Sequence, residues 1–592
     1  MPWFATPAAA VVVYLLVANL VRGHGGGTRV ETVPAAPLAD ADMDRVAALV
    51  AGWWKGEEPP PGAAPARLAE PAWGIYAAAR AGGKLRGEVW RDGGTVGSSL
   101  MSAVRGLRNR VPDGEVASID AIELCLTHSY RDAEVRTTDH PIGDVHRGVR
   151  GIELRRGNDH LRLGPTEMIA RDLDFGDTVG RFLADQGIGE EEVAAGTIDA
   201  QTFECEQVLV QLGAPPRATL MFRGNRVVEL ADVTADALAR TETLLSDWML
   251  HNELADGRMT YLYAPSTGSE KPGNNMIRQW MASLALVRIG QRRGDPSVFE
   301  AAARNIRWNL SQWYREKDGL GLIVFEGEAK LGAIALAAMS IIEHPERPSF
   351  AATEKALVAA TFAAQEDSGR FRTYLQGGDQ DQQHNYYPGE TLLLWSGLYR
   401  EHPDAQLLER FMRSMRYYRT WHRDHRNPAF IPWHTQAYWR MWQLTRDDEL
   451  RAWIFEMNDW LCDYQEWDES PYPDLRGRFY DADRPGYGPP HASSTGVYLE
   501  GLIAAYQLAR TVGDDGRALR YRTAIVRGLR SLLQLTFADD VDLYYVADRD
   551  RVRGGVRTTE YENEIRVDNV QHNLLGIMEI GRVFQPADYQ LP

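Results

Sequence analysis

Polar and apolar positions in the second half of the chain follow a repeating pattern of paired helices. From residue 236 onward, amphipathic stretches fit helices at 236–255, 296–315, 350–366, 404–421, 447–463 and 515–536. Each is followed by a stretch that is apolar nearly all round. An amphipathic helix covers a core with one face, whereas a helix that is apolar all round is buried. The pattern therefore predicts six outer and six inner helices in alternation.

Each inner helix is preceded by a short polar segment. The six segments are NNMIRQW at 274–280, EGEAK at 326–330, DQDQQHNYYPGE at 379–390, WHTQAY at 433–438, HASST at 491–495 and DNVQH at 568–572. The third is the densest, with Asp379, Asp381, His384, Tyr386 and Glu390 inside twelve positions. This density of polar and titratable residues has two possible explanations: the segment is the solvated tip of a loop, or it is part of a functional site.

The alternation of outer and inner helices resembles the (α/α)6 toroid of carbohydrate-active enzymes, the six-hairpin barrel. The resemblance covers residues 236–584. It implies a closed ring of inner helices whose N-terminal ends share one mouth, where the positive ends of the helix dipoles favour anionic groups. Enzymes of this fold are mostly hydrolases, polysaccharide lyases or uronate epimerases.

Residues 66–230 show a mixture of helical and strand-like patterns that is typical of an α+β domain. Helical patterns at 66–81, 95–111 and 166–186 alternate with strand-like runs at 84–90, 119–128, 151–155, 160–163, 202–212 and 217–222. The motifs LRG at 85–87, IEL at 122–124, GVRGIEL at 148–154, LGP at 163–165 and TFECE at 202–206 resemble the AMME-syndrome-candidate (AMMECR) domain. That family carries a Cys where this chain has Glu88, and no nucleophile–base pair is evident. We expect a binding or positioning module here.

The composition of the chain disfavours some classes of binding partner and of metal site. A net charge of -17 disfavours nucleic acid, because phosphate binding needs a concentrated basic face. The three cysteines, Cys125, Cys205 and Cys462, show no paired or CxxC spacing, so neither a disulfide framework nor a thiolate metal site is indicated. We expect a polysaccharide or oligosaccharide substrate and no cofactor, while protein partners stay unknown.

Candidate catalytic groups for hydrolysis are carboxylates from different repeats, because glycoside hydrolysis uses one acid and one base or nucleophile. The candidates are Glu328, Asp381, Glu390 and Asp568. A lyase or epimerase would instead use Tyr386 or His384 to remove a proton beside a carboxylate that Arg278 and amides neutralise. Hydrolysis is the primary expectation; a uronate lyase or epimerase is the first alternative. A noncatalytic glycan-binding or assembly subunit of an envelope complex is the second.

The expected substrate-binding residues follow from helical spacing. Asn275, Arg278 and Gln279 share one face of the first inner helix, and Asp568 and His572 are spaced i, i+4 on the last. The remaining candidates are His434, Tyr438 and His491. Convergence of three histidines among His384, His434, His491 and His572 would make a zinc site, but no HExxH spacing supports one, and we expect no metal.

The N-terminal residues 4–21 form an apolar run near the ~20 residues that span a bilayer. Arg22 and Arg29 follow the run and no basic residue precedes it, which favours a cytoplasmic body. A polysaccharide substrate favours the opposite side of the membrane, so we expect a single membrane anchor with the body of the protein in the periplasm or at the cell exterior. The first alternative is a body on the cytoplasmic side, and the second is that residues 4–21 form a buried N-terminal helix. The expected multidomain order is a membrane helix at 1–22, a Pro/Gly-rich linker at 23–65 that holds one short helix at 40–54, the α+β domain at 66–230 and the all-α toroid at 231–592.

Overall fold

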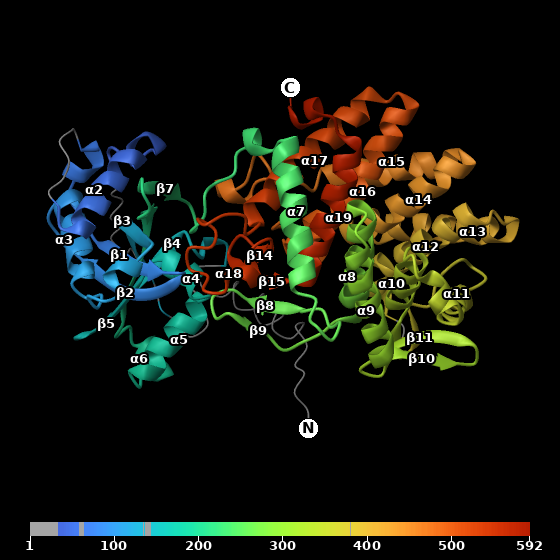
Figure 1. Cartoon of the computed structure of the whole chain (residues 1–592), viewed down its shortest axis with the longest axis horizontal. Coiled ribbons are helices and arrows are strands. Elements are labelled where there is room, and N and C mark those ends of the chain that lie inside the picture. The colour runs from blue at the N-terminus through green and yellow to red at the C-terminus, as the bar shows by residue number, and fades with distance from the viewer. Residues whose placement is uncertain (1–33, 58–63, 134, 136–143, 379, 592) are drawn as a thin grey trace. The chain divides into compact units, whose positions relative to one another are not determined.

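The computed structural model describes residues 34–57, 64–133, 135, 144–378 and 380–591. The chain divides into two compact units, Met1–Arg226 and Val227–Pro592 (Figure 1). Each has its own architecture.

The first unit is built on an antiparallel sheet in the order β2-β1-β3-β6-β4-β5, with β7 paired to the second half of β6. The strands are β1 (Ile75–Ala81), β2 (Lys84–Arg91), β3 (Ala121–Ala133), β4 (Arg150–Arg156), β5 (Asp159–Leu163), β6 (Asp199–Gln211) and β7 (Arg217–Met221). The helices are α2 (Met43–Lys55), α3 (Val96–Arg108), α4 (Pro165–Ala170), α5 (Phe175–Asp185) and α6 (Glu190–Ala194).

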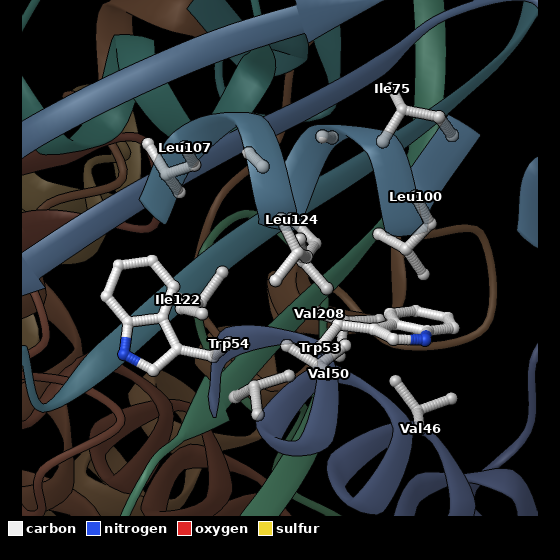
Figure 2. Packing of buried hydrophobic residues seen from close by; sticks show 14 of the residues in the cluster. Val46, Val50, Trp53, Trp54, Ile75, Leu100, Leu107, Ile122, Leu124 and Val208 are labelled. Atoms are coloured by element: carbon white, nitrogen blue, oxygen red, sulfur yellow. The ribbon is translucent and has the colours of Figure 1, made fainter. Parts of the chain in front are cut away.

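The main core of this unit lies between the sheet and helices α2 and α3. Figure 2 shows Trp53 and Trp54 of α2 beside Leu100 and Leu107 of α3 and strand residues such as Leu124. Helix α2 corresponds to the short helix predicted at 40–54 inside the linker segment 23–65. Nine of its thirteen residues are buried, so it is part of the folded unit.

The prediction of a helix at 66–81 in this unit is wrong. The alanine-rich stretch 66–81 forms a short 3-10 turn, Ala66–Ala69, and then the fully buried strand β1. Strand β1 joins β2 through Gly82 and Gly83, which both have positive φ, the backbone that two-residue hairpins require. Small alanines let the neighbouring elements pack closely, and this tertiary contact overrides the helix propensity of alanine.

The second unit is a closed ring of inner helices, which confirms the predicted (α/α)6 toroid. The inner helices are α8 (Met276–Arg293), α10 (Leu331–Ile342), α12 (Tyr387–Glu401), α14 (Ile431–Thr445), α16 (Ala492–Val512) and α19 (Val567–Val583). Each contacts the next in this order, and α19 contacts α8 to close the ring.

Each inner helix is covered by one outer helix. The outer helices are α7 (Ala235–His251), α9 (Pro296–Trp313), α11 (Ala351–Ala364), α13 (Ala405–Asp424), α15 (Asp448–Cys462) and α17 (Asp515–Leu535). The outer helices α9, α11, α13, α15 and α17 each pack against the inner helix that precedes them in the chain. Helix α7 instead packs against α19, at the other end of the sequence.

Two small sheets and a short helix, α18 (Arg549–Val552), complete the toroid. One sheet contains β10 (Tyr314–Lys317), β11 (Leu320–Phe325), β12 (Glu328–Lys330) and β13 (Tyr374–Gln376). The other contains β14 (Arg557–Thr559), β15 (Glu562–Arg566), β8 (Leu262–Ala264) and β9 (Ser269–Glu270). Strand β12 runs directly into α10 and β15 into α19, so each strand delivers its last residue to an inner-helix N-terminus.

The expected membrane helix requires a correction, both in the fold class and in the location derived from it. Across the described parts of the chain, no helix is long and apolar enough to cross a bilayer. The apolar run at 4–21 lies outside the described residues. The longest described helices, α16 and α17, carry charged residues such as Glu500 and Arg530. The architecture of the described residues is an antiparallel α+β unit followed by a helical toroid that carries two small sheets.

Candidate functional site

The N-terminal ends of all six inner helices line one cavity of about 400 Å³. Five N-cap residues take part: Asn275, Lys330, Tyr386, His491 and Arg566. Because the positive pole of each helix dipole lies at its N-terminus, the cavity favours anionic groups.

Two arginines from different elements hold one buried carboxylate in this cavity. Arg278 Nε lies 2.9 Å from Asp568 Oδ2, and Arg566 donates from Nε and Nη2 to Asp568 Oδ1 and Oδ2 at 3.0 and 2.5 Å. Burial would raise the pKa of Asp568, but the charges of Arg278 and Arg566 outweigh it and hold this pKa far below its usual range. Asp568 is therefore ionised and only weakly basic.

The same arginine pair affects His491. Its Nδ1 lies 3.1 Å from Arg566 Nη1, so it accepts this hydrogen bond as a neutral imidazole. Burial and the charge of Arg566 lower the pKa of His491 to about 4. Arg278 also donates to the hydroxyl of Tyr261 through Nη1.

A second histidine is oriented by a buried carboxylate. His572 Nδ1 lies 2.8 Å from Glu500 Oε1, and the Glu500 side chain is 1% exposed. A carboxylate accepts hydrogen bonds, so the Nδ1 of His572 carries the proton and Nε2 is left as the basic atom. His572 lines the cavity, and this arrangement is that of an oriented general base.

Glu390 contributes a neutral acid to the same cavity. Its side chain lies in the first turn of α12 and is 2% exposed, and burial raises its pKa to about 8. Gly332 of α10 makes room for this carboxyl group, because a Cβ at position 332 would overlap Glu390 Oε2. At neutral pH Glu390 is mainly protonated and can donate a proton.

Aromatic residues form much of the remaining wall. Tyr386 is 37% exposed, and Trp433, Tyr487 and Tyr498 line the cavity with it. Enclosure by the walls raises the pKa of Tyr386, although Arg278 opposes this effect, so the phenol keeps its proton. Aromatic faces of this kind stack against sugar rings as readily as they pack in a core.

Three of the expected catalytic residues lie outside this cavity. Glu328 is 3.3 Å from Lys330 and lines a smaller adjacent pocket of about 150 Å³, which shares Asn275 and Lys330 with the main cavity. Asp381 is exposed on the 3-10 turn Asp381–Asn385. His384 is buried, with Nδ1 3.0 Å from the hydroxyl of Tyr418.

Three of the expected substrate-binding residues are also placed elsewhere. Gln279 is buried and donates to Met259 O and Asn274 Oδ1. His434 Nδ1 lies 2.8 Å from Phe430 O, where burial lowers the pKa of His434 to about 3. Tyr438 is fully buried behind it, with ring centroids 5.5 Å apart.

The cavity brings together seven expected residues: Asn275, Arg278, Tyr386, Glu390, His491, Asp568 and His572. Six further residues at or beside the cavity were not among the predicted site residues: Lys330, Trp433, Tyr498, Glu500, Arg566 and Gln571. Lys330 and Arg566 share one signal, since each is the last residue before an apolar helix. Glu500 lies inside a helix that is apolar nearly all round, and a pattern of this kind does not tell which side faces a cavity, whereas Gln571 belongs to the predicted polar segment 568–572 but carries no separate signal.

The donor set does not gather around one point as metal ligands do. Within the described ranges, no group of three or more His, Cys, Asp or Glu side chains is placed to hold a metal ion. His491 faces Arg566 and His572 faces Glu500, which are hydrogen-bonding arrangements.

Comparisons with known proteins give structural neighbours at low identity. No family model matches the sequence, and no curated protein matches it. D-mannose isomerase is 10% identical over 59% of this chain and 99% of its own, with a TM-score of 0.45. Cellobiose 2-epimerase from Bacillus thermoamylovorans is 11% identical over 58% and 98%, with a TM-score of 0.44. An uncharacterized protein from Pyrococcus horikoshii is 16% identical over 30% of this chain and 93% of its own, with a TM-score of 0.25.

Proposed function

We propose that the toroid is a carbohydrate-active enzyme that moves a proton at a carbon next to the carboxylate of an acidic sugar, as uronate lyases and epimerases do. The observation that carries this proposal is the oriented base His572 in one cavity with the cations Arg278 and Arg566. These are the groups that removal of a proton beside a carboxylate requires.

The substrate carboxylate would bind near Arg278. Arg278, Arg566 and Lys330 bring three positive charges to the cavity wall, while Asp568 offsets one of them and Glu328 lies 3.3 Å from Lys330. An anionic group gains from this excess and from the helix dipoles. Neutralising the carboxylate makes the proton on the adjacent carbon more acidic.

The proton would then pass to His572 Nε2. Glu500 holds the imidazole through Nδ1 and stabilises the imidazolium that forms. The electron pair left on carbon moves toward the carboxylate, where the arginines stabilise it. Return of a proton to the opposite face gives an epimer, whereas loss of the oxygen substituent on the next carbon gives an unsaturated product.

Two cavity residues could supply the second proton. Glu390 is neutral at pH 7, and Tyr386 keeps its phenolic proton. Either could protonate a leaving oxygen or the planar carbon. The aromatic wall would hold the sugar ring in place during the transfer.

Hydrolysis is the second candidate, and Glu390 is the observation that favours it. A buried, protonated carboxyl group is what the acid of a glycosidase needs. Its partner would have to be Asp568, the other carboxylate that lines the cavity. The two arginines on Asp568 weaken it as a base, which is why proton abstraction is preferred.

The test is incubation of the full chain with neutral and uronate-bearing polysaccharides in D₂O. Deuterium at the carbon next to the carboxylate, or a new absorbance from unsaturated uronates, supports the proposal, provided that His572→Gln abolishes it. Glu500→Gln should lower the rate by ~10-fold to 100-fold, because the imidazole loses its orientation.

New reducing ends without deuterium or unsaturation would favour hydrolysis instead. In that case Glu390→Gln and Asp568→Asn should be inactive, while His572→Gln keeps activity. Glycan binding without turnover on any substrate would favour the noncatalytic alternative.

A further inference from the structure

Gln571 is a fully buried amide at the cavity wall that lacks a hydrogen-bond partner among the residues that the structure describes. It lies on α19 between Asp568 and His572, lines the cavity and is 0% exposed. Within the described part of the chain, neither its Oε1 nor its Nε2 has a hydrogen-bond partner. A folded protein rarely leaves both ends of an amide in this state, because burial removes the hydrogen bonds to water.

Another buried glutamine of the same toroid is engaged. Gln279 of α8 is 1% exposed, and its Nε2 donates to Met259 O and Asn274 Oδ1 at 3.2 and 3.0 Å, so that within the described residues only its Oε1 lacks a partner, whereas both ends of Gln571 do. Gln279 does not line the cavity, whereas Gln571 does. The unpaired amide therefore coincides with the place where a ligand would supply the missing partners.

We propose that Gln571 is the residue that recognises the uncharged part of the sugar, by hydrogen bonds to its hydroxyl or carbonyl oxygens. This rests on the proposed function. An amide offers acceptor and donor positions together, as a sugar hydroxyl does. The charge of the substrate and its hydroxyl pattern are then recognised by different residues, the first by Arg278 and the second by Gln571.

The position on α19 fits this role. Asp568, Gln571 and His572 are spaced i, i+3 and i+4, so they share the face of the helix that borders the cavity. A sugar whose carboxylate is held near Asp568 by the arginines and whose reacting carbon faces His572 lies beside Gln571. The amide reaches it by rotation about its own side-chain torsions, and the adjacent volume of about 400 Å³ gives room for this movement.

The first measurement compares melting temperatures of the full chain carrying Gln571→Met or the matched control Gln279→Met. Methionine keeps the length of glutamine and removes its polarity. Loss of a buried amide without partners should raise the melting temperature, by roughly 2 °C or more, whereas loss of the engaged amide of Gln279 should lower it.

The second measurement uses two probes of the same ring size, D-glucuronate and cyclohexanecarboxylate, titrated calorimetrically. Both carry a carboxylate, and only the first carries hydroxyls. We expect the wild type to prefer glucuronate and Gln571→Met to reduce that preference by about 10-fold or more, with the affinity for cyclohexanecarboxylate unchanged. Arg278→Met should weaken both probes.

Either of two results overturns the inference: a melting temperature that falls in Gln571→Met as it does in the control, or an unchanged preference for glucuronate in this variant. If the wild type binds neither probe, the acidic-sugar part of the proposed function fails, and the melting temperatures still decide. A rise supports a recognition role for Gln571, and a fall makes it a structural residue.

Discussion

The carboxyl group of Glu390 is held in surroundings that favour its neutral form, and the fold therefore depends on its proton. Its native pKa is about 8, against an ordinary value of 4.5. Between these values the native state binds more protons than the unfolded state, so the stability that comes from this group is lost as the pH rises.

This difference predicts the effect of Glu390→Gln. The variant should lack the loss of stability that Glu390 causes between pH 5 and pH 8, which is at most about 1.4 kcal/mol per pH unit for one group. Urea denaturation at pH 5, 6.5 and 8 measures it. Equal pH slopes in the two proteins would mean that the carboxyl group is ionised in the native state.

His434 has the opposite dependence. It is buried as a neutral imidazole, and its pKa is lowered from 6.5 to about 3. The unfolded state then binds more protons below pH 6.5, so stability should fall as the pH decreases toward 3. His434→Phe should reduce this acid slope by up to about 1.4 kcal/mol per pH unit, while costing ~1 kcal/mol at pH 7 for the hydrogen bond to Phe430. Acid titration of the unfolding free energy measures both effects, and an acid slope that persists unchanged in the variant would contradict the assignment.

The residue scale also shows where sequence inference stops. Asp568 and His572 are four positions apart on α19, a spacing that predicts a mutual contact. Instead, Asp568 binds Arg278 and Arg566, while His572 binds Glu500 of α16. Helical spacing indicates which side chains share a face, but the partners come from other helices and strands, and these appear only when the ring is assembled.

At the scale of single elements, the close approach of α10 and α12 depends on one glycine. Gly332→Ala should force the Glu390 carboxyl group and the Tyr387 ring aside, since both lie where the new methyl group would be. We expect a loss of roughly 1–3 kcal/mol in unfolding free energy, together with loss of the high pKa of Glu390.

Gly397 provides the matched control for this substitution. It also lies in α12, and a Cβ there meets nothing within 4 Å. Gly397→Ala should stabilise the helix by up to about 1 kcal/mol, because alanine loses less backbone entropy than glycine. Thermal unfolding followed by circular dichroism compares the two variants; a similar loss in both would show that the packing at Gly332 is not the cause.

The sequence predicts the elements that have a strong periodic pattern. It does not predict the elements whose conformation depends on contacts with distant parts of the chain. The outer and inner helices of the toroid follow their predicted ranges because burial imposes a regular pattern on each. The sequence of strand β1 predicts a helix, because its buried alanines show no alternation of polar and apolar positions. The strands β12 and β15 are short, yet they place Lys330 and Arg566 in the cavity.

At the scale of the whole molecule, all residues that line the cavity belong to the second unit. A fragment of residues 227–592 should therefore unfold cooperatively and keep the cavity. A fragment of residues 260–592 lacks α7 and leaves the apolar face of α19 uncovered, so it should aggregate. Circular dichroism and sedimentation of the two fragments measure this, and a folded, monomeric 260–592 fragment would show that α7 is dispensable.

The contact of α19 with α8 has a consequence for how the protein is made. Helix α19 is the last of the ring to leave the ribosome, and it carries or adjoins Arg566, Asp568, Gln571 and His572. In the growing chain, the side of α8 that packs against α19 stays uncovered until α19 is synthesised, almost three hundred residues later. Until α19 has been synthesised, the apolar side of α8 lacks its partner, and a chain that ends before α19 would not carry the assembled cavity.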